Sequence, residues 1–162
     1  MARRLLPVGL DFVETAPLRL VFAREVSASP DAVYRALAED VAGWPQWFSA
    51  VTLARPLDDG ADGPRREVRL KGGTRFVETI VAAEPDGLYA YRADETNAPG
   101  VRALLEEWRV VAVPGGSRVQ WTFAADGAAP FRVGLKVGRA GLGRAFRDAV
   151  EALDRRLSSA NA

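Results

Sequence analysis

The chain has 162 residues, of which 48% are hydrophobic and 27% are charged, with 22 Lys and Arg against 21 Asp and Glu. This composition is typical of one folded domain, and a formal charge of +1 is too small for the long-range field that nucleic-acid binding requires. Cysteine and histidine are both absent, which excludes disulfides, thiolate and imidazole metal sites, and catalysis by Ser-His-Asp or Cys-His groups.

Residues 1–17 show no clear period and contain Pro7 and Pro17, so we expect an N-terminal extension before a domain that spans residues 18–158. The first apolar run is interrupted by Pro7 and ends at Asp11, short of a signal core. No stretch approaches the ~20 apolar residues of a membrane helix. We therefore expect a cytoplasmic protein with no integral membrane segment, and the sequence leaves both a monomer and a homodimer open.

Hydrophobic and polar residues alternate over residues 18–26, as they do in a half-buried strand. Ser29 and Pro30 then favour a helix start, because a Ser side chain accepts a hydrogen bond from the first turn and Pro is tolerated at its first position. A second short helix is expected to open at Trp44 and Pro45. Two short helices thus follow the first strand.

After these helices the chain alternates almost without pause. The segments expected as strands are Val51–Arg55, Arg66–Lys71, Thr74–Ala83, Leu88–Ala93, Leu104–Val113 and Ser117–Ala124. Short turns rich in Gly, Pro and Asp separate them, so neighbouring strands are expected to pair antiparallel.

The C-terminal part returns to a helical period. Its apolar stripe comprises Phe131, Leu135, Leu142, Phe146, Val150, Leu153 and Leu157. We expect one long closing helix laid against a curved sheet, an α+β arrangement. The spacing of Gly134 and Gly138 favours a close approach of this helix to the sheet, and the alternative is a loosened helix end that gates a cavity.

Alternation places one aromatic-rich set of side chains on the inner face of the sheet. The set is Phe22, Val68, Leu70, Phe76, Ile80, Tyr89, Tyr91, Trp108, Val110, Val119, Trp121 and Phe123. These side chains either fill a core or line a pocket for flat or extended apolar ligands. Arg24, Glu78 and Glu106 share the inward parity, and they either form the polar end of such a pocket or lie exposed near strand ends.

The chain resembles the SRPBCC superfamily, which includes START lipid carriers and polyketide cyclases, in several segments. The opening of these proteins is similar to residues 26–37 (VSASPDAVYRAL), Asp40 and residues 44–47 (WPQW). The later strands of polyketide aromatase/cyclase members look like residues 84–92 (EPDGLYAYR), 95–100 (ETNAPG), Trp108 and 114–121 (PGGSRVQW). The resemblance covers about residues 18–158 and implies the helix-grip (START-like, Bet v 1-like) fold. In that fold a curved antiparallel sheet wraps around a long C-terminal helix, with two short helices after the first strand.

The resemblance also implies a cavity between the concave sheet face and the C-terminal helix. It would hold a small hydrophobic or aromatic molecule, lipid- or polyketide-like, with no cofactor, no metal and no nucleic acid as partner. The expected ligand-binding residues are Trp47, Phe48, Leu70, Phe76, Glu78, Ile80, Tyr89, Tyr91, Glu106, Trp108, Trp121 and Phe123.

A carrier or sensor of such a molecule is the expected function, and a polyketide aromatase/cyclase is the alternative. The cavity Tyr and Arg of those enzymes correspond here to Val51 and to Ala82 or Ala83, so no residue is assigned a catalytic role. An enzyme would have to use Glu78, Glu106, Tyr89 or Tyr91 instead. A protein interaction module is a third option, for which no residue speaks specifically.

Overall fold

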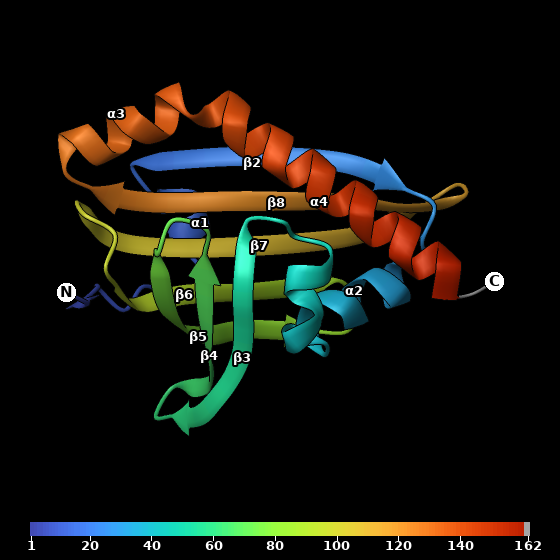
Figure 1. Cartoon of the computed structure of the whole chain (residues 1–162), viewed down its shortest axis with the longest axis horizontal. Coiled ribbons are helices and arrows are strands. Elements are labelled where there is room, and N and C mark those ends of the chain that lie inside the picture. Colours follow the sequence, from blue (N-terminus) through green and yellow to red (C-terminus); the bar gives the residue numbers. More distant parts are fainter. Residues whose placement is uncertain (161–162) are drawn as a thin grey trace.

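The computed structural model describes residues 1–160 and has a single sheet with most of its helices along one side (Figure 1). In chain order the elements are β1 (Arg3–Arg4), α1 (Phe12–Thr15), β2 (Leu18–Val26), α2 (Pro30–Ala38), the 3-10 helix η1 (Val41–Gln46), β3 (Val51–Gly60), β4 (Gly63–Leu70), β5 (Arg75–Glu84), β6 (Leu88–Thr96), β7 (Val101–Val113), β8 (Gly116–Gly127), α3 (Ala129–Val137) and α4 (Arg139–Ala160).

The sheet is antiparallel throughout, and its strands follow the order β2-β8-β7-β6-β5-β4-β3. Strands β3 to β8 form a meander of neighbouring hairpins, and β2 pairs with β8 at the far edge. The sheet curves, and α4 crosses its concave face in front of β2 and β8 (Figure 1). This confirms the α+β architecture expected from the alternation and the helical tail.

The two short helices that follow β2 are held by different interactions. Helix α2 begins as predicted, since the Ser29 side chain accepts a hydrogen bond from the backbone N–H of Ala32 at 3.3 Å and Pro30 takes the first position. The prediction that a second helix opens at Trp44 is wrong in position, because η1 already ends at Gln46. Trp44 instead anchors this turn, with a buried ring whose Nε1 donates to the carbonyl oxygen of Leu37 at 3.0 Å.

The single closing helix expected from the apolar stripe is two helices, α3 and α4, which meet at Gly138. The backbone N–H of Gly138 donates to the carbonyl oxygen of Gly134 at 2.8 Å and ends α3. Helix α4 buries one side in the core, whereas α3 has no fully buried residue. Figure 1 shows the two helices at an angle. Phe131 and Leu135 of α3 border a cavity between this helix and the sheet.

The close approach of helix and sheet occurs at Gly143 rather than at Gly134 and Gly138. A Cβ atom added at Gly143 would lie 3.1 Å from Cε1 of Phe22, a residue of β2. The same addition at Gly134 would meet no atom within 4 Å. The expectation of close packing at Gly134 and Gly138 is therefore wrong, because the break turns this part of the chain away from the sheet.

The N-terminal segment is joined to the sheet. Strand β1 pairs with the end of β6, and the Arg3 guanidinium donates to the carbonyl oxygen of Ala98 at 2.5 Å. Helix α1 buries Val13 and contacts β7 and β8. Elements of two and four residues are too short to show a period, which is why alternation and helical spacing did not reveal them.

Replacement of Gly134 by Ala is expected to raise the free energy of unfolding by about 0.5–1 kcal/mol. The added methyl group enters open space in a helix, and Ala has less conformational freedom to lose than Gly. The matched control is Gly143→Ala, whose methyl group must displace the Phe22 ring and should therefore stabilise less. Urea denaturation of both variants measures the difference, and an equal or larger gain for Gly143→Ala would contradict the packing described for α4.

Candidate functional site

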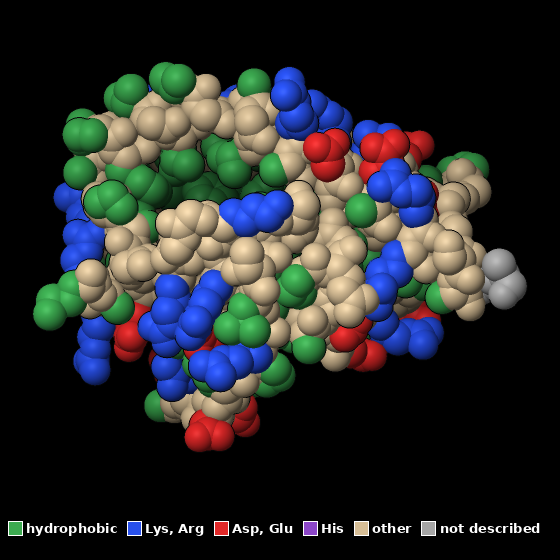
Figure 2. Space-filling view, in the orientation of Figure 1, with side chains coloured by type: hydrophobic (Ala, Val, Ile, Leu, Met, Phe, Trp, Pro, Cys, Tyr) green, Lys and Arg blue, Asp and Glu red, His purple; other side chains and the backbone are tan. Residues whose placement is uncertain are grey.

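A cavity of about 250 Å³ lies between the concave face of the sheet and helices α3 and α4. Figure 2 shows it as a hollow lined by hydrophobic side chains below α3. The residues around it are Trp44, Phe48, Ala50, Val51, Arg66, Val68, Leu70, Phe76, Glu78, Tyr91, Ala98, Val101, Leu104, Glu106, Trp121, Phe123, Phe131, Leu135, Leu142 and Ala145. Strands β3 to β8 supply one wall, and the two C-terminal helices supply the opposite one. Trp44 of η1 and Phe48, which follows this helix, close one end.

A second apolar depression adjoins the cavity where the loop between β6 and β7 faces α3. Both hollows share Ala98, Phe131 and Leu135. In the loop, Gly100 has a positive φ of 81°, and a Cβ at this position would lie 3.0 Å from Cβ of Phe131. A glycine here therefore lets the loop and α3 approach each other beside the cavity.

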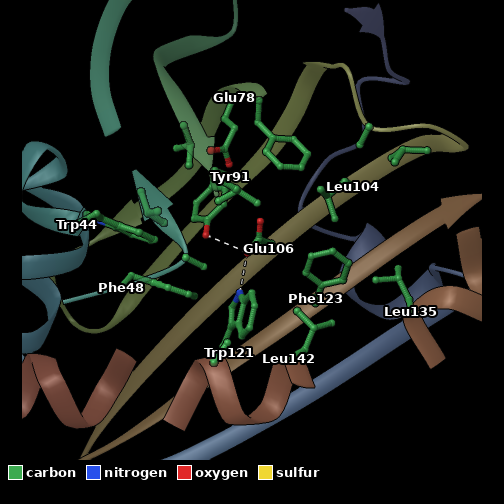
Figure 3. Close-up of a pocket in the computed structure, with 18 of the residues that line it drawn as sticks. Trp44, Phe48, Glu78, Tyr91, Leu104, Glu106, Trp121, Phe123, Leu135 and Leu142 are labelled. Carbon is green, nitrogen blue, oxygen red and sulfur yellow. Dashed lines mark hydrogen bonds between the residues drawn. The ribbon is translucent and has the colours of Figure 1, made fainter. Parts of the chain in front are cut away.

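The polar end of the cavity is built around the carboxyl group of Glu106 (Figure 3). Its Oε1 accepts a hydrogen bond from the Tyr91 hydroxyl at 3.1 Å and another from Nε1 of Trp121 at 2.9 Å. The Tyr91 oxygen in turn accepts from Nε1 of Trp108 at 3.1 Å. Strand register sets this chain of hydrogen bonds, since Tyr91 lies directly opposite Glu106 and Trp108 opposite Trp121.

Beside this group lies a buried ion pair between neighbouring strands. Arg66 on β4 and Glu78 on β5 are direct cross-strand partners, with Nε of Arg66 3.4 Å from Oε1 of Glu78 and both side chains almost fully buried. The guanidinium carbon lies 3.9 Å from the ring centre of Tyr91 and 4.5 Å from that of Trp44, which adds cation–π attraction. One guanidinium nitrogen also donates to the Tyr89 hydroxyl at 3.3 Å.

Burial and the surrounding charges change the acidity of these groups. Burial and, to a lesser extent, the neighbouring carboxyl of Glu78 raise the pKa of Glu106 to about 8, against the opposing effects of Arg66 and of the hydrogen bonds from Tyr91 and Trp121. Burial also raises the pKa of Glu78, although its partner Arg66 acts in the other direction. The pKa of Tyr91 lies well above its usual value, because the ring is buried and Glu106 is close.

This arrangement supplies a neutral carboxylic acid at neutral pH, because one cation is buried together with two carboxyl groups. Glu78 lies against the cation, which opposes the rise of its pKa, whereas Glu106 has no ion-pair partner among residues 1–160. A protonated carboxyl in an apolar cavity is both a hydrogen-bond donor and a weak acid. The site is therefore suited to a polar atom of an otherwise apolar molecule.

The structure brings together eight of the residues that the sequence placed in the site. The cavity is lined by Phe48, Leu70, Phe76, Glu78, Tyr91, Glu106, Trp121 and Phe123. Of the charged residues with inward parity, Glu78 and Glu106 face the cavity, while Arg24 lies at the surface and pairs with Glu151 of α4 at 3.3 Å.

Four other expected residues lie inward but away from the cavity. Ile80 and Tyr89 border a separate depression next to η1. Trp47 borders another depression, between α2 and α4. Trp108 is fully buried and supports the site from behind, through its hydrogen bond to Tyr91 and its packing against the ring of Trp121. Alternation identified the correct face of the sheet, but helix packing decides which part of that face stays hollow.

The sequence reasoning missed Arg66, Trp44 and the apolar residues of α3 and α4 that close the cavity. Arg66 has the same parity as Val68 and Leu70, which were expected inward, so alternation along β4 was a usable signal. An Arg in a strand is most often exposed, and the sequence gives no sign that Glu78 stands opposite it.

Two negative findings hold for residues 1–160. No helix in this range is long and apolar enough to cross a membrane. No group of three or more Asp and Glu residues in the same range is arranged to hold a metal ion.

Comparison with known sequences gives one family. The family model described as polyketide cyclase / dehydrase and lipid transport matches residues 17–158. Two similar proteins are uncharacterized protein Mb2604 of Mycobacterium bovis and uncharacterized protein Rv2574 of Mycobacterium tuberculosis. Each is 37% identical over 143 residues, which is 86% of this chain and 84% of the relative.

Solved structures share the fold at low sequence identity. A START superfamily protein from Mycobacterium smegmatis has a TM-score of 0.68 and 16% identity, over 87% of this chain and 97% of that protein. Zhui aromatase/cyclase from Streptomyces sp. R1128 has a TM-score of 0.67 and 19% identity, over 87% of this chain and 93% of the enzyme.

The raised pKa of Glu106 predicts how stability depends on pH. The folded state keeps a proton that the unfolded state loses near pH 4.5, so the contribution of this group is full below that pH and is lost as the pH rises to about 8. Relative to a Glu106→Gln variant, the wild-type free energy of unfolding should fall by roughly 1 kcal/mol per pH unit in this window.

Denaturant unfolding between pH 5 and pH 8 measures this dependence. Glu14→Gln, at an exposed position of α1, is the control and should follow the wild type. Parallel curves for the wild type and Glu106→Gln would show that Glu106 is already ionised in this range.

Proposed function

The chain belongs to the polyketide cyclase/dehydrase and lipid transport family, and from this membership we propose that it binds a small hydrophobic or aromatic molecule in its cavity. In this proposal the protein acts as a carrier or sensor. The observation that carries the proposal is a space of about 250 Å³ surrounded mostly by apolar side chains, with a small cluster of polar groups at one end. The proposed place of action is the cytoplasm.

The size of the cavity limits the ligand. Ligand pockets for drug-sized molecules measure about 300 to 1,000 Å³, and the space here is slightly below that range. A molecule of two or three fused rings, or a short acyl chain, matches such a volume. A whole membrane lipid would require α3 to move outwards.

The walls favour a flat molecule. The rings of Trp44 and Phe48 are nearly parallel, with an interplanar angle of 6° and centres 6.2 Å apart. Trp121 stands edge-on to Phe48 and to Phe123, at 84° to each. Aromatic walls of this kind bury a planar ligand and interact with its faces and edges.

The proposed contact residues are the eight residues that the sequence predicted as ligand-binding and that line the cavity. They are Phe48, Leu70, Phe76, Glu78, Tyr91, Glu106, Trp121 and Phe123. In the same proposal Trp47, Ile80, Tyr89 and Trp108 support the site from the surrounding core.

A polyketide aromatase/cyclase is the second candidate, and the acid–hydroxyl pair of Glu106 and Tyr91 is the observation in its favour. In such a reaction a polyketone loses an α-proton, the enolate carbon attacks a second carbonyl carbon, and the new alkoxide takes up a proton before water leaves. A neutral Glu106 can supply the proton to the carbonyl oxygen. Against an enzyme, Val51 provides no hydroxyl at the position where the resemblance would place a Tyr.

Filling the cavity is expected to weaken ligand binding without harm to the fold. Ala145→Phe projects a ring from α4 into the space and should weaken binding of a naphthalene probe by about tenfold or more, equivalent to about 1.4 kcal/mol. Ala140→Phe, at an exposed position of the same helix, is the matched control. Quenching of intrinsic Trp fluorescence measures both, because Trp44 and Trp121 line the cavity. Equal binding by the two variants would reject the cavity as the binding site.

Native mass spectrometry of gently purified protein separates the two candidate functions. If the protein is a carrier, the spectrum should show a small apolar molecule bound to it. When this molecule is released and incubated with fresh protein, its mass should not change. Conversion of an added aromatic polyketone into a cyclised product that has lost water would instead favour the cyclase.

A further inference from the structure

The two oxygens of the Glu106 carboxyl group differ in their hydrogen bonds: one accepts two, and the other accepts none from the described residues. Oε1 accepts the hydrogen bonds of Tyr91 and Trp121, whereas Oε2 has no hydrogen-bond partner among residues 1–160. The part of this side chain that stays exposed faces the cavity, which it lines (Figure 3). A ligand in the cavity therefore meets Oε2 as an unsatisfied polar atom.

The charges around this oxygen determine its protonation. Arg66 on β4 is the one cation that lines the cavity, and it is paired with Glu78 on β5. Tyr91 on β6 contributes a neutral hydroxyl. Helices α3 and α4 present only apolar side chains to the space, so no second cation balances Glu106 within the described chain. The proton therefore stays on the carboxyl group and, since Oε1 already accepts from two donors, it occupies Oε2.

From this geometry we infer that the cavity selects a neutral, largely apolar molecule with a carbonyl oxygen at one end, and that Glu106 donates a hydrogen bond to that oxygen through Oε2. The inference rests on the proposed function and names the ligand class for the same cavity. It makes Glu106 the residue that determines specificity, while the apolar wall determines only size and shape.

Charged ligands are excluded by the same set of residues. A carboxylate would lie beside the carboxyl groups of both Glu78 and Glu106. An amine would have to lose its water shell next to the guanidinium of Arg66 and draw the proton from Glu106. A carbonyl group avoids both costs, the repulsion by nearby carboxyl groups and the loss of a charged group's water shell, because it carries no charge and accepts one hydrogen bond.

The test compares three naphthalene probes of similar size: 2-acetylnaphthalene, its apolar shape match 2-isopropylnaphthalene, and the cation 2-(aminomethyl)naphthalene. Binding is measured by Trp fluorescence quenching and by calorimetry for the wild type and Glu106→Gln at pH 6 and pH 9.5. The readout is the ratio of the Kd of the isopropyl probe to the Kd of the acetyl probe.

In the wild type this ratio should fall about fivefold between pH 6 and pH 9.5, because ionisation removes the donor. In Glu106→Gln the ratio should not change with pH, since the amide N–H donates at both values. The variant must also keep the far-UV circular dichroism spectrum of the wild type, and the wild-type pH series tests the inference without any variant.

Two results would overturn the inference. One is a wild-type ratio that is equal at both pH values, and the other is tightest binding of the amine, lost in Glu106→Gln. In both cases the apolar probe still binds, so the proposed function stands. Failure of all three probes to bind would reject the proposed function itself and the inference with it.

Discussion

Among the described residues, one guanidinium and two carboxyl groups line the cavity, and the chemistry of the cavity depends on that imbalance. Arg66 pairs with Glu78 and lies against aromatic rings. Glu106 is left without a counterion among the described residues, so burial favours its neutral form. A closed apolar core would gain nothing from this arrangement, whereas an apolar cavity gains one directional hydrogen-bond donor at its end.

The fold holds the carboxyl group of Glu106 in place and also keeps the cavity beside it open. Two interactions at the polar end join neighbouring strands, because Arg66 lies opposite Glu78 and Tyr91 opposite Glu106. On the other side, the break at Gly138 lets α4 pack on the sheet while α3 stays above it. This arrangement of a hydrogen-bonded polar end and an apolar end covered by α3 is consistent with the carrier function that we propose.

The sequence predicted the face of the sheet but not the limits of the cavity. Period-2 alternation depends only on local geometry, so it placed Glu78, Tyr91 and Glu106 correctly on the inner side. It could not separate Phe123, which lines the cavity, from Ile80, which does not, because distant helices decide which stretch is covered. Arg66 was missed for a similar reason, since its role depends on the register between β4 and β5.

The protonation of Glu106 connects the stability, the ligand class and any catalysis by this protein, and it can be observed directly. Carbon-13 NMR of protein labelled at the Glu side-chain carboxyl group, with Glu106→Gln for assignment, follows this one group through a pH titration. A midpoint of about 8 for the signal that is absent from the variant is the result we predict. A midpoint near 4.5, the ordinary value for Glu, would contradict the account, because the cavity would then present a carboxylate rather than a donor.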